Sequence, residues 1–272
     1  MNKSIKKYIL TFIMIIITCI GLLPFIWLIL GCFKTNREIF FIQNFWPENG
    51  FTFQYFKMLE NEYFDFKVIY WNSFKVATIH AFFVLLITAP AGYIYAKFNF
   101  YGKRIFLFIA LFVLLIPKQA LIIPYVESLS NLNLMDSHWG LILPSIANVL
   151  GFLFFIQIFK GIPNDLLETA RLEGANEIGV FMQILPLIKA PLWTFALLDF
   201  VLTWNEHLFP LIVIQSQQKR TLPIALAALT DSSLSQPMAV LMAGSLLAMI
   251  PAILLFACSY KTMRSALKDL IS

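Results

Sequence analysis

The chain has 272 residues, of which 60% are hydrophobic and only 13% are charged, and its mean hydropathy is +0.78. Because an average soluble domain carries roughly a quarter charged residues, this composition excludes a soluble domain, a disordered chain and a nucleic-acid-binding protein. The three cysteines lie in apolar runs without a Cys-x-x-Cys spacing, which argues against a disulfide framework or a zinc site. A protein that crosses a membrane several times remains.

Six segments are long enough to cross the membrane, since a helical span needs about 20 mostly apolar residues. Four of them contain no Asp, Glu, Lys or Arg, namely residues 8–33, 76–96, 137–159 and 232–260. The other two are interrupted by polar groups, because 105–126 contains Lys118 and Gln119, and 190–214 contains Asp199, Glu206 and His207. An ionisable side chain is costly in lipid and usually faces a protein interior or a water-filled cavity. The two interrupted spans are therefore the candidates for an intramembrane functional site.

The positions of Lys and Arg predict that both termini are cytoplasmic. With that orientation, twelve basic residues lie in cytoplasmic segments: Lys3, Lys6, Lys7, Lys97, Lys103, Arg104, Lys160, Arg171, Lys189, Lys261, Arg264 and Lys268. Six lie in the longer extracytoplasmic segments. This asymmetry accounts for the net charge of +5 without an acidic partner. We expect an N-terminal span with an extracytoplasmic loop, residues 1–70, followed by a core of five spans, residues 71–272.

The extracytoplasmic segment 34–71 mixes aromatic side chains with five carboxylates. Its aromatic residues could lie at the level of the lipid headgroups, as Trp and Tyr often do. They could equally form a docking surface for an extracytoplasmic partner, and the sequence leaves both interpretations open.

One cytoplasmic segment, at about residues 161–190, differs from a simple connector. Pro163 fits the first turn of a helix, Gly174 fits a left-handed stop, and Asn176 fits the cap of a second helix that ends at Pro186. The pattern predicts two short helices joined at Gly174. Their apolar faces would hold Leu166, Leu167 and Ala170 on the first helix, and Val180, Phe181 and Ile184 on the second. Such an element can fill a groove in another protein.

This segment resembles the EAA loop of the inner-membrane subunits of ABC importers, through which a permease contacts its ATPase. The resemblance rests on Glu168-Thr169-Ala170, then Gly174, then Ile184-Leu185-Pro186. Two departures are Thr169, where the family has alanine, and an end one residue shorter than the family's Ile-x-Leu-Pro. Further landmarks make nearly the whole chain similar to the maltose-type permeases of the carbohydrate uptake-1 family: Lys34-Thr35, Asn72-Ser73-Phe74, Pro117, Pro124-Tyr125, Trp204-Asn205-Glu206 and Thr221-Leu222-Pro223.

The resemblance implies an all-α permease of the type I ABC importer fold, with six transmembrane helices, in a bacterial inner membrane. It implies three partners: a second homologous permease, a cytoplasmic nucleotide-binding ATPase dimer and an extracytoplasmic solute-binding protein. ATP and Mg²⁺ would bind the ATPase, and we expect no cofactor or metal in this chain. The chain also lacks a phosphate-binding loop, because Gly102-Lys103 is followed by Arg104 and has no glycine five residues earlier.

The predicted function is that of a non-catalytic permease subunit that imports a sugar or oligosaccharide. An importer of glycerol phosphate or another polar metabolite is the alternative. A membrane enzyme or a non-transporting scaffold is less favoured, because Asp199 and Glu206 would lie about 10 Å apart along a helix, which is poor geometry for sharing a proton.

The site residues are predicted in two groups. The ATPase-coupling loop would contain Glu168, Thr169, Ala170, Glu173, Gly174, Ala175 and Pro186. The candidates for the translocation path are Lys118, Gln119, Asp199, Trp204, Asn205 and Glu206. For Lys118, the alternatives are contact with the transported solute, snorkelling, or pairing with a carboxylate. For Trp204-Asn205-Glu206, an alternative role is hydrogen bonding between helices.

Overall fold

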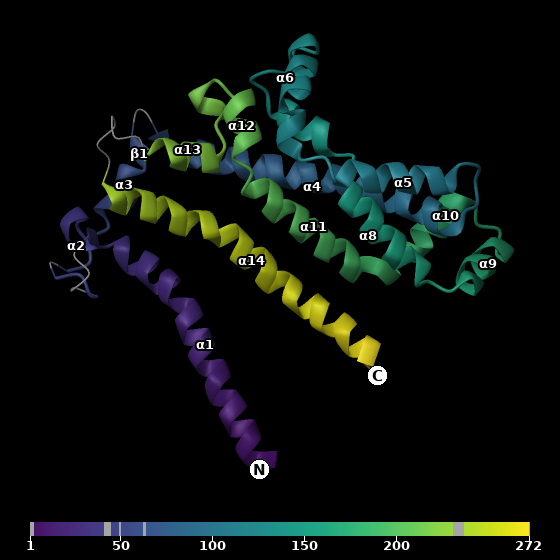
Figure 1. Ribbon diagram of the computed structural model, residues 1–272, viewed down its shortest axis with the longest axis horizontal. Helices are drawn as coiled ribbons and strands as arrows, with labels where there is room; N and C mark the ends of the chain where they lie inside the picture. The colour runs from purple at the N-terminus through teal and green to yellow at the C-terminus, as the bar shows by residue number, and fades with distance from the viewer. Residues whose placement is uncertain (1–2, 41–44, 49, 62–63, 231–236, 272) are drawn as a thin grey trace. The chain divides into compact units, whose positions relative to one another are not determined.

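The computed structural model describes residues 3–271 except 41–44, 49, 62–63 and 231–236. Its helices are shown in Figure 1. The chain forms two compact units, residues 1–67 with 225–250, and residues 68–224 with 251–272. Among the described residues, four helices are long and apolar enough to cross a membrane, and the number of candidate spans is six if each of two bent helix pairs counts as one span. This confirms the prediction of an all-α membrane protein.

The first unit contains the N-terminal span and short elements beyond it. These are α1 (Lys3–Gly31), α2 (Asn36–Phe40), α3 (Gln54–Met58), and the two-residue strands β1 (Glu60–Asn61) and β2 (Phe64–Asp65), which pair antiparallel. Part of the aromatic content of segment 34–71 packs locally, since the ring of Phe33 contacts those of Phe51, Phe53 and Phe56. The helix α14 (Met238–Ile271) begins in this unit, and the predicted residues 232–236 of its span lie outside the described residues.

The second unit holds the remaining elements. They are α4 (Phe66–Lys97), α5 (Lys103–Leu114), η1 (Lys118–Leu121), α6 (Ile122–Asn131), α7 (His138–Ile142), η2 (Leu143–Ser145), α8 (Val149–Lys160), α9 (Asn164–Leu172), α10 (Glu177–Ile184), η3 (Leu185–Ile188), α11 (Lys189–Trp204), α12 (Leu208–Val213), η4 (Gln217–Lys219) and the start of α13 (Leu222–Ala228). The bounds of α4 and α13 each cross into the first unit by a few residues.

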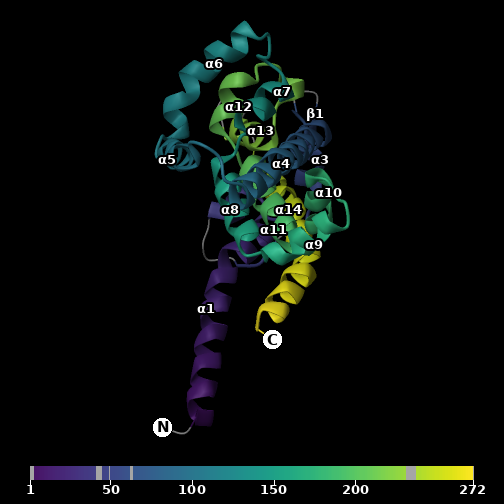
Figure 2. The ribbon, with the colours of Figure 1, turned by 90° about the vertical axis from the view of Figure 1, so that its right-hand side faces the viewer.

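The third span is broken, as Pro117 predicts. The helix α5 ends at Leu114, Pro117 adopts an extended conformation, and the chain turns by 95° into η1 and α6. Figure 2 shows α5 and α6 on either side of this bend. A proline removes one backbone hydrogen bond and clashes with the preceding turn, which explains why the helix stops here. The fourth span also bends, by 47° between Ser145 and Val149, and this bend was not predicted.

The prediction of one span over residues 190–214 is wrong. The helix that α10, η3 and α11 form ends at Trp204, and α12 begins separately at Leu208. The Asn205 side chain donates to the Val201 carbonyl at 2.7 Å, and a polar side chain that bonds the backbone locally competes with continued helix. Asn205 and Glu206 therefore lie in the connection after the span and not within it.

The core of the second unit lies where α4, α8 and α11 meet. Its buried residues include Val84 and Tyr93 of α4, Phe155 of α8 and Phe195 of α11. The helices α4 and α8 approach closely because position 92 is glycine: a Cβ there would lie 2.6 Å from the Cβ of Phe155. A membrane helix pair uses small residues in this way to bring the backbones together.

Candidate functional site

The predicted pair of short helices is confirmed as α9 and α10, and a Schellman motif joins them. The amide of Ala175 donates to the Ala170 carbonyl at 3.1 Å, and the amide of Gly174 donates to the Arg171 carbonyl at 3.0 Å. Gly174 has φ +88, a conformation that glycine adopts without steric cost. The Asn176 side chain then accepts from the Gly179 amide at 2.8 Å and caps α10.

One face of this α9–α10 pair packs on the ends of the membrane helices. Leu167, Ala170, Val180 and Ile184 are buried in the same cluster as residues of α4, α8 and α11. Leu166, which the sequence pattern places on the same apolar face as Leu167 and Ala170, is 49% exposed. Of these three residues, only Leu167 and Ala170 are buried in the cluster, so the buried face of α9 is narrower than the sequence pattern predicts.

The opposite face carries most of the residues that resemble the EAA motif. Glu168, Thr169, Glu173 and Gly174 are exposed, whereas Ala170 is buried and Ala175 is half-buried. Leu172 and Ile178 are also on the surface, 88% and 71% exposed. Pro186 is exposed in η3, and η3 runs directly into α11. The shortened end of the motif thus connects the helix pair to the fifth span without an intervening loop.

Polar contacts fasten the α9–α10 pair to α4. The ammonium of Lys97 donates to the Asn164 side chain at 2.9 Å and to the Ile162 carbonyl. Arg171 and Glu177 form a two-bond ion pair, at 2.9 and 3.2 Å, across the turn at Gly174. The hydrogen bond to Glu177 raises the pKa of the Arg171 guanidinium. The Tyr93 hydroxyl also donates to Glu177, at 3.3 Å, so that α4 contacts both short helices.

Asp199 is buried and belongs to a network of polar side chains. Its carboxylate oxygen Oδ2 is 2.7 Å from Nδ1 of His80 in α4, and Oδ1 accepts from Nδ2 of Asn148 at 3.2 Å. Nε2 of His80 lies 2.9 Å from the Ser145 hydroxyl, and Nδ1 lies 3.0 Å from the Thr203 hydroxyl. We refer to these five residues as the Asp199–His80 network. The partner of Asp199 is therefore His80, which the sequence did not predict, and not Glu206 or His207 of its own segment.

His80 could have been found from the sequence. It lies near the middle of α4, in the segment 76–96, which contains no Asp, Glu, Lys or Arg. An ionisable residue within a span is by default a candidate functional residue with a partner to be sought. The partner itself lies 119 positions away and has no local sequence signal.

The other path candidates differ in exposure. Lys118 and Gln119 are exposed at the bend between α5 and α6. Trp204 is buried at the end of α11, where its ring stacks on Phe200 and meets Tyr70 edge-on. The Asn205 side chain is exposed and that of Glu206 is half-buried. Their contact with a transported solute stays a prediction.

Comparison with known proteins identifies the chain. The family model described as the binding-protein-dependent transport system inner membrane component matches residues 88–268. The chain belongs to this family. It is a transport permease and a multi-pass protein of the bacterial cell membrane.

Individual relatives match over almost the whole permease. It is 31% identical to the arabinooligosaccharides transport system permease protein AraQ of Halalkalibacterium halodurans, over 94% of this chain and 92% of that protein. It is 28% identical to the lactose transport system permease protein LacG of Rhizobium radiobacter, over 87% and 86% of the two chains. A chain from the crystal structure of a bacterial ABC transporter that imports the acidic polysaccharide alginate has the same fold, with a TM-score of 0.82, 21% identity, and coverage of 96% and 98%.

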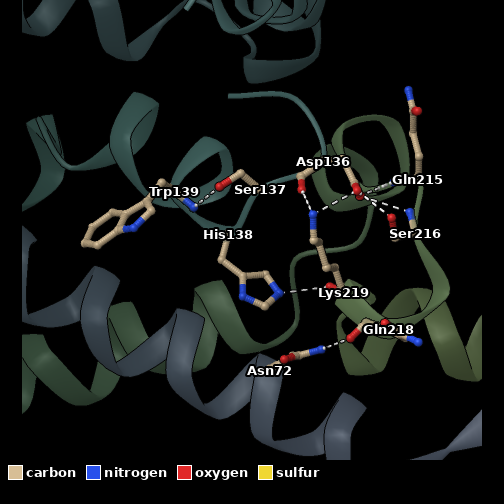
Figure 3. Close-up of polar contacts among 9 residues, drawn as sticks. All are labelled: Asn72, Asp136, Ser137, His138, Trp139, Gln215, Ser216, Gln218 and Lys219. Atoms are coloured by element: carbon tan, nitrogen blue, oxygen red, sulfur yellow. Dashed lines mark hydrogen bonds and ion pairs between the residues drawn. The ribbon is translucent and has the colours of Figure 1, made fainter. Parts of the chain in front are cut away.

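At the end of α4 opposite Lys97, polar contacts join two connecting segments of the permease to each other and to α4 (Figure 3). The carboxylate of Asp136, whose φ is +52, accepts from the amides of Gln215 and Ser216 at 3.0 and 2.9 Å. It also accepts from the Ser216 hydroxyl and from the Lys219 ammonium. Asn72 of α4 donates to the Gln218 carbonyl at 2.7 Å. The hydrogen bonds from Ser216, and then that from Lys219, lower the pKa of the Asp136 carboxyl well below its usual range.

Proposed function

We propose that this permease is one subunit of an ATP-driven importer for a sugar or oligosaccharide, and that the α9–α10 pair couples it to an ATPase. The observation that carries the proposal is the two-sided character of the pair. One face is buried on α4, α8 and α11, and the other exposes Leu172 and Ile178 beside Glu168 and Glu173. A helix pair that exposes large apolar side chains beside charged groups fits a groove in a partner protein.

The cargo class is inferred from the named relatives, because AraQ and LacG are described as permeases for arabinooligosaccharides and lactose. Glycerol phosphate or another polar metabolite is the alternative cargo. In either case the proposed partners are a second homologous permease, a cytoplasmic ATPase dimer that binds ATP and Mg²⁺, and an extracytoplasmic solute-binding protein. Hydrolysis would take place in the ATPase, since the chain lacks a phosphate-binding loop.

The mechanism we propose is a change between two states that the ATPase selects. ATP binds the closed ATPase dimer more tightly than the open one, so that closure biases whichever permease state fits it. The closing ATPase would move the α9–α10 pair. Lys97 and Tyr93 would pass this displacement to α4, and η3 would pass it to α11. We place the α9–α10 pair and both termini on the cytoplasmic side, as the distribution of Lys and Arg predicts.

The test compares two glycines with the same backbone conformation. Gly174 has φ +88 and Gly102 has φ +81, and no atom lies within 4 Å of a Cβ built at either position. Gly102 precedes α5 and lies outside the α9–α10 pair. An aspartate at either position incurs a similar backbone strain, because residues other than glycine rarely adopt such a φ.

We expect Gly174→Asp to abolish ATP-driven uptake while the protein still inserts into the membrane, and Gly102→Asp to retain uptake. Uptake would be measured in vesicles that contain the full complex, with labelled arabinotriose, lactose and sn-glycerol-3-phosphate as separate cargoes. Normal uptake by Gly174→Asp would refute the coupling role. Uptake of only the phosphorylated compound would favour the alternative cargo, and no ATP-dependent uptake of any polar solute would refute the transport proposal.

A further inference from the structure

The Asp199–His80 network connects three membrane-spanning segments at one point. His80 lies near the middle of α4, Asp199 and Thr203 lie on α11, and Ser145 and Asn148 flank the bend of the fourth span. The side chains of His80 and Asp199 are only 5% and 3% exposed. The network therefore ties the bend, rather than a regular part of a helix, to two neighbouring spans.

The hydrogen bonds of this network are satisfied. A buried polar group without a hydrogen-bond partner is costly. Both carboxylate oxygens of Asp199 and both ring nitrogens of His80 have a partner within 3.2 Å. A buried polar network that is fully satisfied favours a single arrangement of the elements it joins.

The helix α4, which carries His80, is also held by polar contacts at its two ends. At one end Lys97 and Tyr93 contact the α9–α10 pair. At the other, Asn72 donates to the Gln218 carbonyl, and the Ser73 hydroxyl accepts from the Leu222 amide at 2.6 Å. The fourth span has no such continuous helix, because its helical hydrogen bonds are interrupted at the bend, residues 146–148. The angle between the two halves of this span can therefore change most easily at the bend.

We propose that His80 and Asp199 are positioning residues for transport: they make α4, α11 and both halves of the bent fourth span move as one rigid body. Without them, the bend acts as a hinge and absorbs the displacement that enters through the α9–α10 pair. The proposal rests on the proposed coupling function of that pair. It assigns the network a role in transmitting motion, in addition to its contribution to stability.

The test removes both partners together. A single substitution would leave a buried polar group unpaired, whereas replacement of both by apolar residues of similar volume often preserves stability. The variant is His80→Leu with Asp199→Val. Thr194→Val is the control, since Thr194 is also on α11 and its hydroxyl bonds only the Ala190 carbonyl of the same helix among the contacts described.

Motion would be followed with spin labels at Leu143→Cys and Gln157→Cys, exposed positions in the two halves of the bent fourth span. Cys19, Cys32 and Cys258 would be replaced by alanine. The distance between the labels would be measured in the reconstituted complex, with and without Mg²⁺ and a non-hydrolysable ATP analogue. We expect the parent and Thr194→Val to show one distance that the nucleotide does not change. The double variant, with a melting temperature near that of the parent, should show a second, displaced distance population when the nucleotide is bound.

A single, unchanged distance in the double variant would overturn the proposal, and so would a nucleotide-dependent distance in the parent. If the double variant does not assemble, a second variant, Ser145→Ala with Asn148→Ser, is tested in its place. It removes the contacts of the bend with His80 and Asp199 and leaves a hydroxyl oxygen that can cap α8. The same second population is expected, and its absence would overturn the proposal. Failure of the coupling function itself is distinguishable, because Gly174→Asp would then transport normally.

Discussion

The Tyr93 hydroxyl of α4 donates to the Glu177 carboxylate of α10, and Glu177 in turn holds Arg171 of α9. One side chain of a membrane helix thus contacts the ion pair that closes the turn at Gly174. The ring of Tyr93 packs separately on Phe98, Phe159 and Phe181. The hydroxyl and the ring can therefore be tested apart.

We predict that Tyr93→Phe lowers ATP-driven uptake several-fold with a small effect on stability. The aromatic packing is kept. A hydrogen bond to a charged group contributes about 1.5–3 kcal/mol, but this one is long, at 3.3 Å, and Glu177 keeps its ion pair with Arg171 in the variant. Uptake and ATP hydrolysis would be measured on the same vesicles. Tyr95→Phe is the control, since Tyr95 contacts its neighbours through its ring. Equal uptake by the parent and Tyr93→Phe would argue against this contact as a route of coupling.

A second prediction concerns the exposed apolar residues of the α9–α10 pair. Leu172→Ser should reduce co-purification of the ATPase with the permease by at least tenfold, because Leu172 is 88% exposed in the isolated chain and would be buried by the partner. A substitution at so exposed a position changes stability by only about 0.5 kcal/mol. Leu132→Ser, at a 66% exposed leucine after α6, is the matched control. Retention of the ATPase by Leu172→Ser would place the docking contact elsewhere.

The close approach of α4 and α8 gives a third prediction. Gly92→Ala should destabilise the permease by about 1–3 kcal/mol, because the added Cβ would meet the Cβ and carbonyl carbon of Phe155 at 2.6 and 2.9 Å. Backbone atoms cannot move aside as a flexible side chain can. Gly21→Ala in α1 is the control, since no atom lies within 4 Å of its Cβ position. Thermal unfolding of both variants would show the difference, and equal melting temperatures would contradict it.

The sequence predicted the elements whose signals are local. Pro117 marks the break of the third span, and Gly174 and Asn176 mark the turn and cap between α9 and α10, because proline, positive φ and capping each depend on a few neighbouring residues. Hydropathy likewise located each candidate span, although its bounds for the fifth were wrong. The roles of the predicted site residues remain proposals.

The features that depend on distant residues could not be predicted. The Asp199–His80 contact joins positions 119 apart, and the bend at Asn148 is held by that contact and by the capping of α8. The end of α11 at Trp204 was missed because hydropathy continues through residues 208–214. Average hydropathy does not detect a polar side chain that bonds its own helix, as Asn205 does.

The last prediction concerns pH and the contacts of Asp136. Its pKa is lowered in the folded state because the hydroxyl and amide of Ser216, and then Lys219, donate to the carboxylate. Because the folded state lowers the pKa of this carboxyl, the ionised carboxylate stabilises the folded state at pH values above its ordinary pKa of about 4. This stabilisation is lost as the pH falls from about 4 toward the pKa in the folded state. We therefore expect the amides of Gln215 and Ser216 to become less protected from hydrogen exchange below that pH, after correction for intrinsic rates.

Two variants test the role of the carboxylate. Asp136→Asn keeps an acceptor and tolerates the positive φ, so the same two amides should be less protected at neutral pH and show no further loss on acidification. Glu127→Gln, at an exposed carboxylate of α6, should behave as the parent. Protection that does not change with pH in the parent would show that these loops are held by other contacts.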